Sequence, residues 1–362
     1  MNVLLLEPYC GGSHAAWAEG YVAHSAHEVT LLSLPARFWK WRMQGGAVTL
    51  AEEARQLKER PDCILASDML NLAAFLALTR DRLADVPTAL YCHENQLTYP
   101  FPPGEKRDLT YGMINWLSML AADRVFFNSR YHFEDWFEAL PNMLKHFPDC
   151  THLHRIAEVH ARASVLPVGC DLARLDAVPP SKDVDQPPLI LWNQRWEYDK
   201  QPRTFFRALY ALKEAGVDFR VALAGRSHRQ SAPEFEEARE RLGGRVVHFG
   251  YAQPEAYAAL LRRSDVVVST AIHEFFGVAV VEAVYAGCFP VLPHRLSYRE
   301  LIPRRFHQRS LYEGFDDLVG CLGWSLTNVD RARAMGVELR IAMQPFDWTA
   351  LAPRYDHELA RF

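Results

Sequence analysis

Residues 269–283 read STAIHEFFGVAVVEA and directly follow a short run of valines that has the length of a strand. The stretch places one carboxylate, Glu274, in a loop, and a glycine, Gly277, at the start of a helix. A second carboxylate, Glu282, lies two turns into that helix. A strand that leads through a short loop into a helix is the repeating step of parallel α/β sheets, so this stretch predicts an α/β fold.

The same step recurs along the whole chain. Short aliphatic or β-branched runs alternate with segments of helical periodicity, which indicates βαβ units on parallel sheets. The expected strands are 2–7, 28–32, 63–66, 88–91, 124–127 and 164–167 in the first half, and 189–193, 219–224, 246–249, 266–269 and 290–292 in the second. Because 362 residues exceed one ordinary core, we expect two Rossmann-like, doubly wound domains that face each other across a cleft.

A polar, proline-rich stretch over residues 176–188 interrupts the alternation and is interpreted as a linker. We therefore expect an N-terminal domain over residues 1–175 and a C-terminal domain over residues 189–344. The tail, residues 345–362, is too short to form a domain, and we expect it to pack back on the N-terminal one.

Composition excludes several classes of protein. A net charge of −4 gives no overall attraction to nucleic acid, and no segment is long and apolar enough to span a membrane. Seven scattered cysteines without a CxxC pair indicate reduced thiols and predict a cytoplasmic location. The sequence has no P-loop, GxSxG elbow or HExxH motif. One cluster resembles a metal site, but its spacing matches no usual zinc pattern, so no metal is expected: Cys150, His152, His154 and His160.

The helix that begins at Gly277 offers a site for a pyrophosphate. Free N–H groups of its first turn, from Phe276 to Val278, and the positive end of its dipole both attract phosphate oxygens, and Gly277 lets the backbone approach closely. Glu274 and Glu282 can then flank the phosphates, one facing sugar hydroxyls and the other ribose hydroxyls. The alternative is a capped helix with a solvated glutamate.

A second candidate is the segment WNQRWEYDK over residues 192–200. Arg195 and Lys200 lie at the end of the first strand of the second half, where both could reach a diphosphate. The alternative is a surface ion pair with Glu197 or Asp199. We assign catalytic roles to Glu274, Arg195 and Lys200 as one diphosphate-binding set.

The two carboxylates and the sequence EAVYAGCFPV over residues 282–291 resemble the E-x7-E motif of glycosyltransferase family 4. This resemblance implies a GT-B fold, a nucleotide-sugar donor, and an Arg195–Lys200 pair that neutralises the leaving diphosphate. It also implies a fourth catalytic residue, His93, close to the donor sugar, and a loop at Gly250 around the nucleotide base. Gly12 opens a helix after the first strand, in position for a phosphate or acceptor contact.

The first half is more specific. Four segments resemble the tRNA-queuosine α-mannosyltransferase family: LEPYCGGSH over 6–14, RFWKWRM over 37–43, SDM over 67–69 and YCHENQ over 91–96. That family implies GDP-mannose as the donor, queuosine in a tRNA anticodon as the acceptor, and retention at the anomeric carbon. One candidate carboxylate beside the sugar is too few for double displacement, which favours a front-face mechanism.

Two alternatives stay open at this point: a family 4 transferase with a lipid or small-molecule acceptor, and a non-catalytic RNA-binding protein on a transferase fold. Residues 37–43 interleave aromatic rings with positive charge, a combination that stacks bases and holds phosphates. The same residues could instead form an amphipathic segment packed on the first domain.

Overall fold

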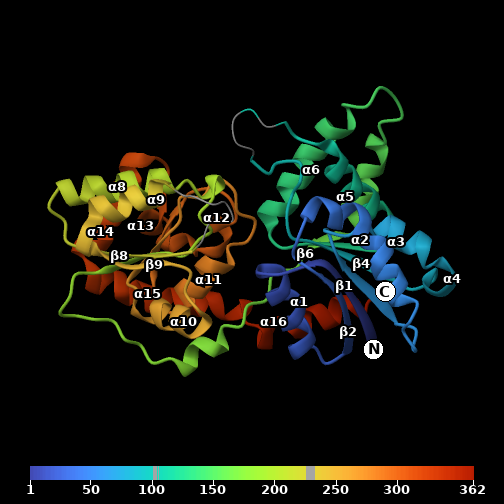
Figure 1. Ribbon diagram of the computed structural model, residues 1–362, viewed down its shortest axis with the longest axis horizontal. Coiled ribbons are helices and arrows are strands. Elements are labelled where there is room, and N and C mark those ends of the chain that lie inside the picture. The colour runs from blue at the N-terminus through green and yellow to red at the C-terminus, as the bar shows by residue number, and fades with distance from the viewer. Residues whose placement is uncertain (101–103, 105, 226–232) are drawn as a thin grey trace. The chain divides into compact units, whose positions relative to one another are not determined.

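The computed structural model describes residues 1–100, 104, 106–225 and 233–362, which form two compact units (Figure 1). Unit 1 comprises Met1–Asp171 together with Trp348–Phe362, and unit 2 comprises Leu172–Asp347. Each unit is a single parallel sheet with helices packed on it. No helix of the described residues has the length and apolar character needed to cross a membrane.

The sheet of unit 1 has the strand order β2-β1-β3-β4-β5-β6, and every neighbouring pair is parallel. Strands covered on both faces need continuous apolar runs, and Cys63–Ser67 and Thr88–Cys92 are buried at every position. The strands are β1 (Asn2–Cys10), β2 (Glu28–Pro35), β3 (Cys63–Ser67), β4 (Thr88–Cys92), β5 (Arg124–Phe127) and β6 (Ala163–Val165).

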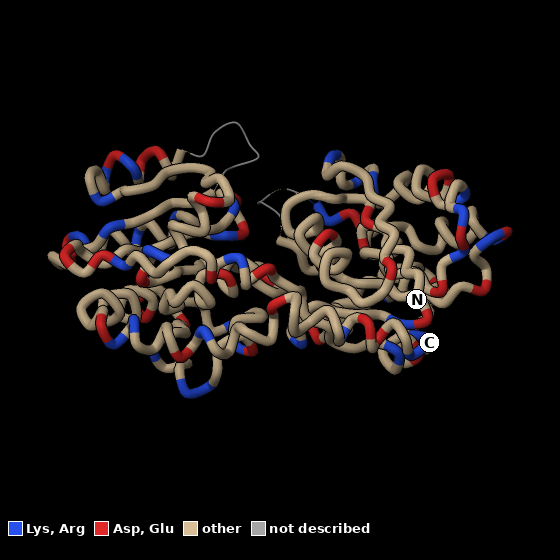
Figure 2. Tube along the Cα trace, turned by 90° about the horizontal axis from the view of Figure 1, so that it is seen from below, with Lys and Arg blue, Asp and Glu red and all other residues tan. Residues whose placement is uncertain are grey.

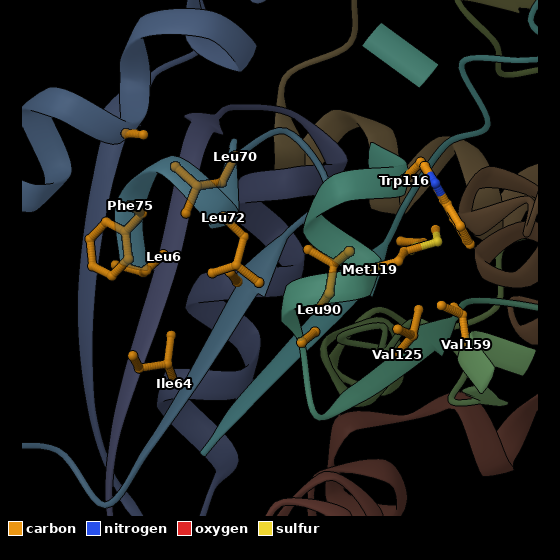
Figure 3. Packing of buried hydrophobic residues seen from close by; sticks show 14 of the residues in the cluster. Leu6, Ile64, Leu70, Leu72, Phe75, Leu90, Trp116, Met119, Val125 and Val159 are labelled. Carbon is orange, nitrogen blue, oxygen red and sulfur yellow. The ribbon is translucent and has the colours of Figure 1, made fainter. Parts of the chain in front are cut away.

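Helices cover this sheet and share its core. Figure 3 shows Leu6, Ile64, Leu90 and Val125 from four strands facing aromatic and aliphatic side chains of the covering helices, Trp116 among them. The helices are α1 (Ser13–His24), α2 (Trp39–Ala54), α3 (Leu72–Leu78), α4 (Arg80–Leu83), α5 (Leu109–Ala121), α6 (Arg130–Leu144) and α7 (Ile156–Ala161).

The last helix, α16 (Trp348–Leu359), also belongs to unit 1 and packs on α1 from the opposite end of the sequence (Figure 1). Trp348 is buried in a slot that only glycines permit, since a Cβ added at Gly20 or Gly169 would come within 2.3 Å of its ring atoms. Tyr355 adds a hydrogen bond from its hydroxyl to the carbonyl of Pro167 at 2.8 Å. Packing and hydrogen bonding therefore both fix the chain end to unit 1.

Unit 2 repeats the architecture with the strand order β12-β11-β10-β7-β8-β9, again parallel. Its strands are β7 (Leu189–Trp192), β8 (Arg220–Ala224), β9 (Val246–Gly250), β10 (Val266–Val268), β11 (Phe289–Pro293) and β12 (Leu311–Tyr312). Its helices are α8 (Pro202–Glu214), α9 (Pro233–Leu242), α10 (Pro254–Arg263), α11 (Val278–Tyr285), α12 (Tyr298–Leu301), α13 (His307–Ser310), α14 (Phe315–Thr327) and α15 (Val329–Met343).

The prediction of two doubly wound parallel sheets is confirmed, and each expected strand overlaps an observed one. The sequence analysis missed β12, because two residues between helical segments carry no periodic signal. Positively and negatively charged residues are interspersed over both units (Figure 2).

Candidate functional site

The loop between β10 and α11 in unit 2 ends in a helix start shaped by Gly277. This residue has φ 95° and ψ 48°, a left-handed conformation that favours glycine. A Cβ there would also lie 3.1 Å from the ring of Tyr298 and 3.6 Å from Cγ of Glu274. Gly277 therefore leaves the first turn of α11 open, with N–H groups of the kind that bind phosphate.

Lys200 lies directly beside this loop, in a short helical turn after β7. Its Nζ donates to the carbonyl of His273 at 2.9 Å and lies 3.2 Å from Oε2 of Glu274 and 3.1 Å from Oδ2 of Asp199. Burial opposes its charge, but Glu274 and then Asp199 outweigh burial, and the pKa of Lys200 is raised. The buried ammonium is therefore fully charged at neutral pH.

Two further hydrogen bonds join the Lys200 turn to the β10–α11 loop. The hydroxyl of Thr270 donates to the carbonyl of Lys200 at 2.7 Å, and the N–H of Ile272 donates to the carbonyl of Asp199 at 2.8 Å. These contacts align segments about seventy residues apart in sequence. They hold Lys200 and Glu274 together independently of their own ion pair.

Arg195 lies close to this pair but is more exposed. Its guanidinium is 3.6 Å from the carboxylate of Glu197, and 46% of its side chain is accessible. Its positive charge acts on Lys200, whose pKa it lowers against the stronger effect of the carboxylates. The structure thus brings Arg195, Lys200 and Glu274 together, with one cation buried and the other at the surface.

Glu282 is held in place by two partners on its two carboxylate oxygens. Arg174 binds Oε1, and the hydroxyl of Tyr257 donates to Oε2 at 3.1 Å. The amide of Asn193 donates in turn to the Tyr257 hydroxyl at 2.9 Å. Glu282 is only 14% exposed, so these bonds set the direction in which it faces.

The side chains of three other candidate residues of unit 2 provide no polar group to a ligand. The ring of Phe276 is buried against Phe346, with ring centres 5.3 Å apart, which leaves its backbone N–H as the group it could offer to a ligand. Val278 begins α11 and contributes its N–H group. Gly250 ends β9 with φ 113° and accepts a hydrogen bond from the N–H of Gly225 at 3.0 Å.

In unit 1 the candidate residue His93 follows β4 and is part of a buried polar cluster. Glu7, in the second half of β1, accepts a hydrogen bond from Nδ1 of His14 at 3.1 Å, and Nε2 of His93 lies 4.0 Å from the same carboxylate oxygen. The His14 and His93 rings are 4.2 Å apart. Gly12, with φ 56°, turns the chain from β1 into α1 and so brings His14 over the strand ends.

The two histidines of this cluster have pKa values shifted in opposite directions. Burial opposes a charge on His14, but Glu7 raises the pKa of His14 to about 9. Burial and then the charge of His14 lower the pKa of His93 well below its usual value. Burial raises the pKa of Asp68, which follows β3, to about 7. Oδ1 of Asp68 and Nε2 of His93 are buried without a hydrogen-bond partner, so a ligand hydroxyl could satisfy both.

Sequence reasoning missed Glu7, His14 and Asp68 as site residues, and Tyr257 and Arg174 as supports of Glu282. Glu7 and Asp68 had a usable signal, since both are acidic residues at strand ends. Tyr257 had none, because it lies within a helix of ordinary periodicity.

Among the described residues, one group of three has metal-ligating atoms within 4.8 Å of one another, namely Glu7, His14 and His93. The cluster of Cys150, His152, His154 and His160 is not such a group. His160 packs its ring on Phe133 and Phe137, with ring centres 4.9 and 4.8 Å away.

Comparison with known proteins identifies both halves of the chain. Residues 2–170 match the family described as tRNA-queuosine alpha-mannosyltransferase N-terminal, and residues 176–315 match glycosyl transferases group 1. A Drosophila melanogaster protein named tRNA-queuosine alpha-mannosyltransferase is 36% identical over 314 residues, which are 84% of this chain and 82% of the relative. This chain belongs to the tRNA-queuosine α-mannosyltransferase family. It is accordingly a glycosyltransferase, as expected from its motifs.

Solved structures agree on the fold. Sucrose-phosphate synthase from Thermosynechococcus elongatus has a TM-score of 0.72 at 16% identity, covering 99% of this chain and 98% of that one. A trehalose-6-phosphate synthase has a TM-score of 0.73 at 13% identity, covering 100% and 99%. Both are GT-B glycosyltransferases, and the predicted GT-B fold is confirmed.

Proposed function

We propose that this protein transfers mannose from GDP-mannose to queuosine in the anticodon of tRNA, with retention at the anomeric carbon. The observation that carries the donor half is the ion pair between the buried Lys200 and the partly exposed Glu274, beside the start of α11 at Gly277. A cation fixed beside a helix N-terminus is suited to a leaving diphosphate. The proposed donor site of unit 2 comprises Arg195, Lys200, Gly250, Phe276, Gly277, Val278 and Glu282. In unit 1, Gly12 stays a candidate for a phosphate or acceptor contact.

The chemistry of departure follows from these contacts. As the bond between the sugar and the diphosphate breaks, negative charge grows on the diphosphate oxygens. Lys200, Arg195 and the N–H groups of α11 stabilise that charge, each donor contributing about 3 kcal/mol on the scale of an oxyanion hole. Glu274, already bonded to Lys200, faces the sugar, and His93 is assigned to the same sugar.

Retention is proposed to occur on one face of the sugar. Double displacement needs two carboxylates about 5 Å apart at the reacting carbon. Among the described residues one carboxylate, Glu274, is assigned to the sugar, since Asp199 is buried against Lys200. The departing diphosphate then accepts the proton of the attacking hydroxyl. No obligatory cofactor is proposed, since the cations already neutralise the diphosphate.

The acceptor half rests on the family match of residues 2–170 and on the name of the Drosophila melanogaster relative. The buried cluster of unit 1 supports it, because Asp68 and His93 present unsatisfied atoms that hydroxyl groups can bind. We also propose that the reaction takes place in the cytoplasm, since all seven cysteines are free thiols.

The decisive assay offers GDP-mannose together with queuosine-containing or queuosine-free tRNA and then measures the mass of the modified nucleoside. We expect one hexose added to queuosine and none to the unmodified tRNA. Equal labelling of both tRNAs, or labelling of a lipid or small metabolite instead, would contradict the acceptor. Replacement of GDP-mannose by UDP- and ADP-sugars tests the donor separately.

A further inference from the structure

The first turn of α2 presents two large aromatic side chains to solvent. Phe38, which precedes the helix, is 79% exposed, and Trp41, one turn later, is 62% exposed. Trp39 between them behaves differently, since it packs on Tyr111 with ring centres 4.8 Å apart. The segment is therefore anchored by Trp39 and displays Phe38 and Trp41, a residue pair named here the aromatic pair.

The backbone of Phe38 is in an unfavourable conformation. It has φ 52° and ψ 56°, the left-handed region that glycine and asparagine enter readily and aromatic residues rarely do. Its side chain gains little burial in return, since most of it is exposed. Strain of this kind marks residues kept for function rather than for stability.

The side chain of Trp41 packs on its own helix. A Cβ added at Gly45 would lie 2.7 Å from Cζ2 and 2.9 Å from Cε2 of Trp41. The indole therefore lies across the bare backbone of Gly45, one turn further along α2. This contact leaves the indole exposed but limits its orientation, and thereby lowers the entropy cost of stacking on a ligand.

The chemistry around the pair is cationic. Arg37 and Lys40 are exposed beside it, and Lys40 Nζ lies 5.6 Å from the ring centre of Trp39. Arg42 donates from Nε to the carbonyl of Pro35 at 3.2 Å and keeps part of its guanidinium accessible. Exposed aromatic rings next to fixed positive charges are what a base and its phosphate require.

We propose that Phe38 and Trp41 form a stacking platform for an unpaired nucleobase of the RNA substrate. The nucleobase must be unpaired, because in a duplex its faces are covered by neighbouring bases. Arg37, Lys40 and Arg42 would contact the phosphates on either side. The platform rests on the proposed function for the identity of the RNA as a tRNA.

Stacking and phosphate contacts differ in how the tRNA affinity depends on salt concentration, and the first experiment uses this difference. Affinity of the full chain for queuosine-containing tRNA is measured across a range of salt concentrations. We expect Trp41→Ala and Phe38→Ala each to weaken binding about tenfold, or about 1.4 kcal/mol, at every salt concentration, with an unchanged salt slope. Lys40→Ala combined with Arg42→Ala should instead flatten the slope by about one or two.

Two further variants test the geometry rather than the presence of the rings. Phe38→Gly relieves the backbone strain, so we expect a higher melting temperature together with weaker tRNA binding. Gly45→Ala favours the helix but displaces the indole of Trp41, so binding should weaken a few-fold with no loss of stability. Ile341→Ala, at an apolar position of unit 2 that is 65% exposed, is the matched control and should bind normally.

Other results would overturn the platform. Wild-type tRNA affinity in both Phe38→Ala and Trp41→Ala would do so, as would equal loss of affinity for a fully paired, blunt-ended RNA duplex. If either substitution instead dissociated a dimer of this chain in sedimentation, the pair would be a contact between copies. Failure of the wild-type enzyme to label queuosine would count against the proposed function, whereas the stacking measurements would still decide the platform.

Discussion

Each unit holds a buried cation next to acidic side chains close to its first strand, but the two units use different cations. In unit 2 a buried ammonium, Lys200, lies between two carboxylates, Asp199 and Glu274. In unit 1 a buried imidazole, His14, is paired with the carboxylate of Glu7. Both cations are held charged by acidic partners, but the imidazole, with a pKa of about 9, loses its charge at a lower pH than the ammonium, whose pKa is raised above 10.5.

This difference teaches what each cluster is suited to. A lysine whose pKa is raised stays positive and suits a diphosphate that is always negative. An imidazole with a pKa of about 9, beside a neutral histidine and an aspartate with a pKa of about 7, provides donors and acceptors for hydroxyl groups. The first arrangement suits the donor and the second suits the acceptor.

Removal of the donor cluster should have the largest effect. We expect Glu274→Gln and Arg195→Ala each to lower kcat/KM for sugar transfer by about a hundredfold or more, because Arg195 stabilises the negative charge that grows on the diphosphate and Glu274 is assigned to the sugar. Arg195 is exposed, so its removal should leave the melting temperature unchanged. Near-normal turnover in both folded variants would contradict the assignment.

Lys200→Ala needs separate treatment. It should abolish transfer, but it also leaves Asp199 buried without its cation, and such a loss costs about 3–5 kcal/mol of stability. The burial of Lys200 could not be foreseen from its spacing to Arg195. Activity must therefore be compared at a temperature where the variant remains folded, as judged by circular dichroism.

The next largest effect concerns the free energy of unfolding, which we expect to depend on pH through the His14 cluster of unit 1. His14 titrates near 6.5 when unfolded and near 9 when folded, so its stabilising contribution is complete below about pH 6.5 and lost as the pH rises through 9. The full loss is about 3 kcal/mol. Asp68 acts in the same direction at lower pH, since its pKa rises from 3.8 to about 7 on folding.

Urea unfolding at pH 6 and pH 9.5 measures this contribution. We expect His14→Asn to be less stable at pH 6 but to show a much smaller decline between the two pH values. His357→Asn, an exposed histidine on α16, serves as the control and should decline as the wild type does. An unchanged decline in His14→Asn would mean that Glu7, Asp68 and Glu94 do not hold a proton on His14.

The candidate residues of unit 2 could be predicted from the sequence better than the cluster of unit 1. Glu274, Gly277 and Glu282 lie within one strand–loop–helix step, so their spacing alone was enough to predict that they belong to one loop and its following helix. The cluster of unit 1 draws on the ends of β1, β3 and β4, and its members meet only because the strand order is β2-β1-β3-β4. Strand order is a property of the folded sheet that local patterns do not encode.

Packing adds information that patterns lack. The interleaved aromatic and basic residues over 37–43 looked equivalent in the sequence. In the structure Trp39 is an anchor against Tyr111, and Phe38 and Trp41 are displayed. Which ring faces inward depends on where α2 meets the rest of unit 1, and on the left-handed turn at Phe38 that precedes it.

A smaller effect is expected from the support of Glu282. Tyr257→Phe removes the hydroxyl that donates to Glu282, and we expect about fivefold weaker binding of the nucleoside diphosphate, or about 1 kcal/mol, with little change in kcat. Tyr285→Phe is the matched control, since that hydroxyl donates to Asp176 and not to Glu282. Calorimetric titration that finds equal affinities for Tyr257→Phe and wild type would show that Glu282 does not need this bond.

The smallest expected effect is that of removing divalent metal, which should leave transfer unchanged. In the proposed donor site the charges of Lys200 and Arg195, with the start of α11, would neutralise a diphosphate, so a magnesium ion would compete with them. The test is the rate of transfer in excess EDTA, and a complete loss restored by magnesium or manganese would contradict it.

Unit 1 needs a second measurement, because Glu7, His14 and His93 have the atoms of a metal site. If EDTA lowered the melting temperature of the wild type but not of His14→Asn, the imidazole would be a metal ligand rather than a cation, and the contrast between the two units would fail at that point.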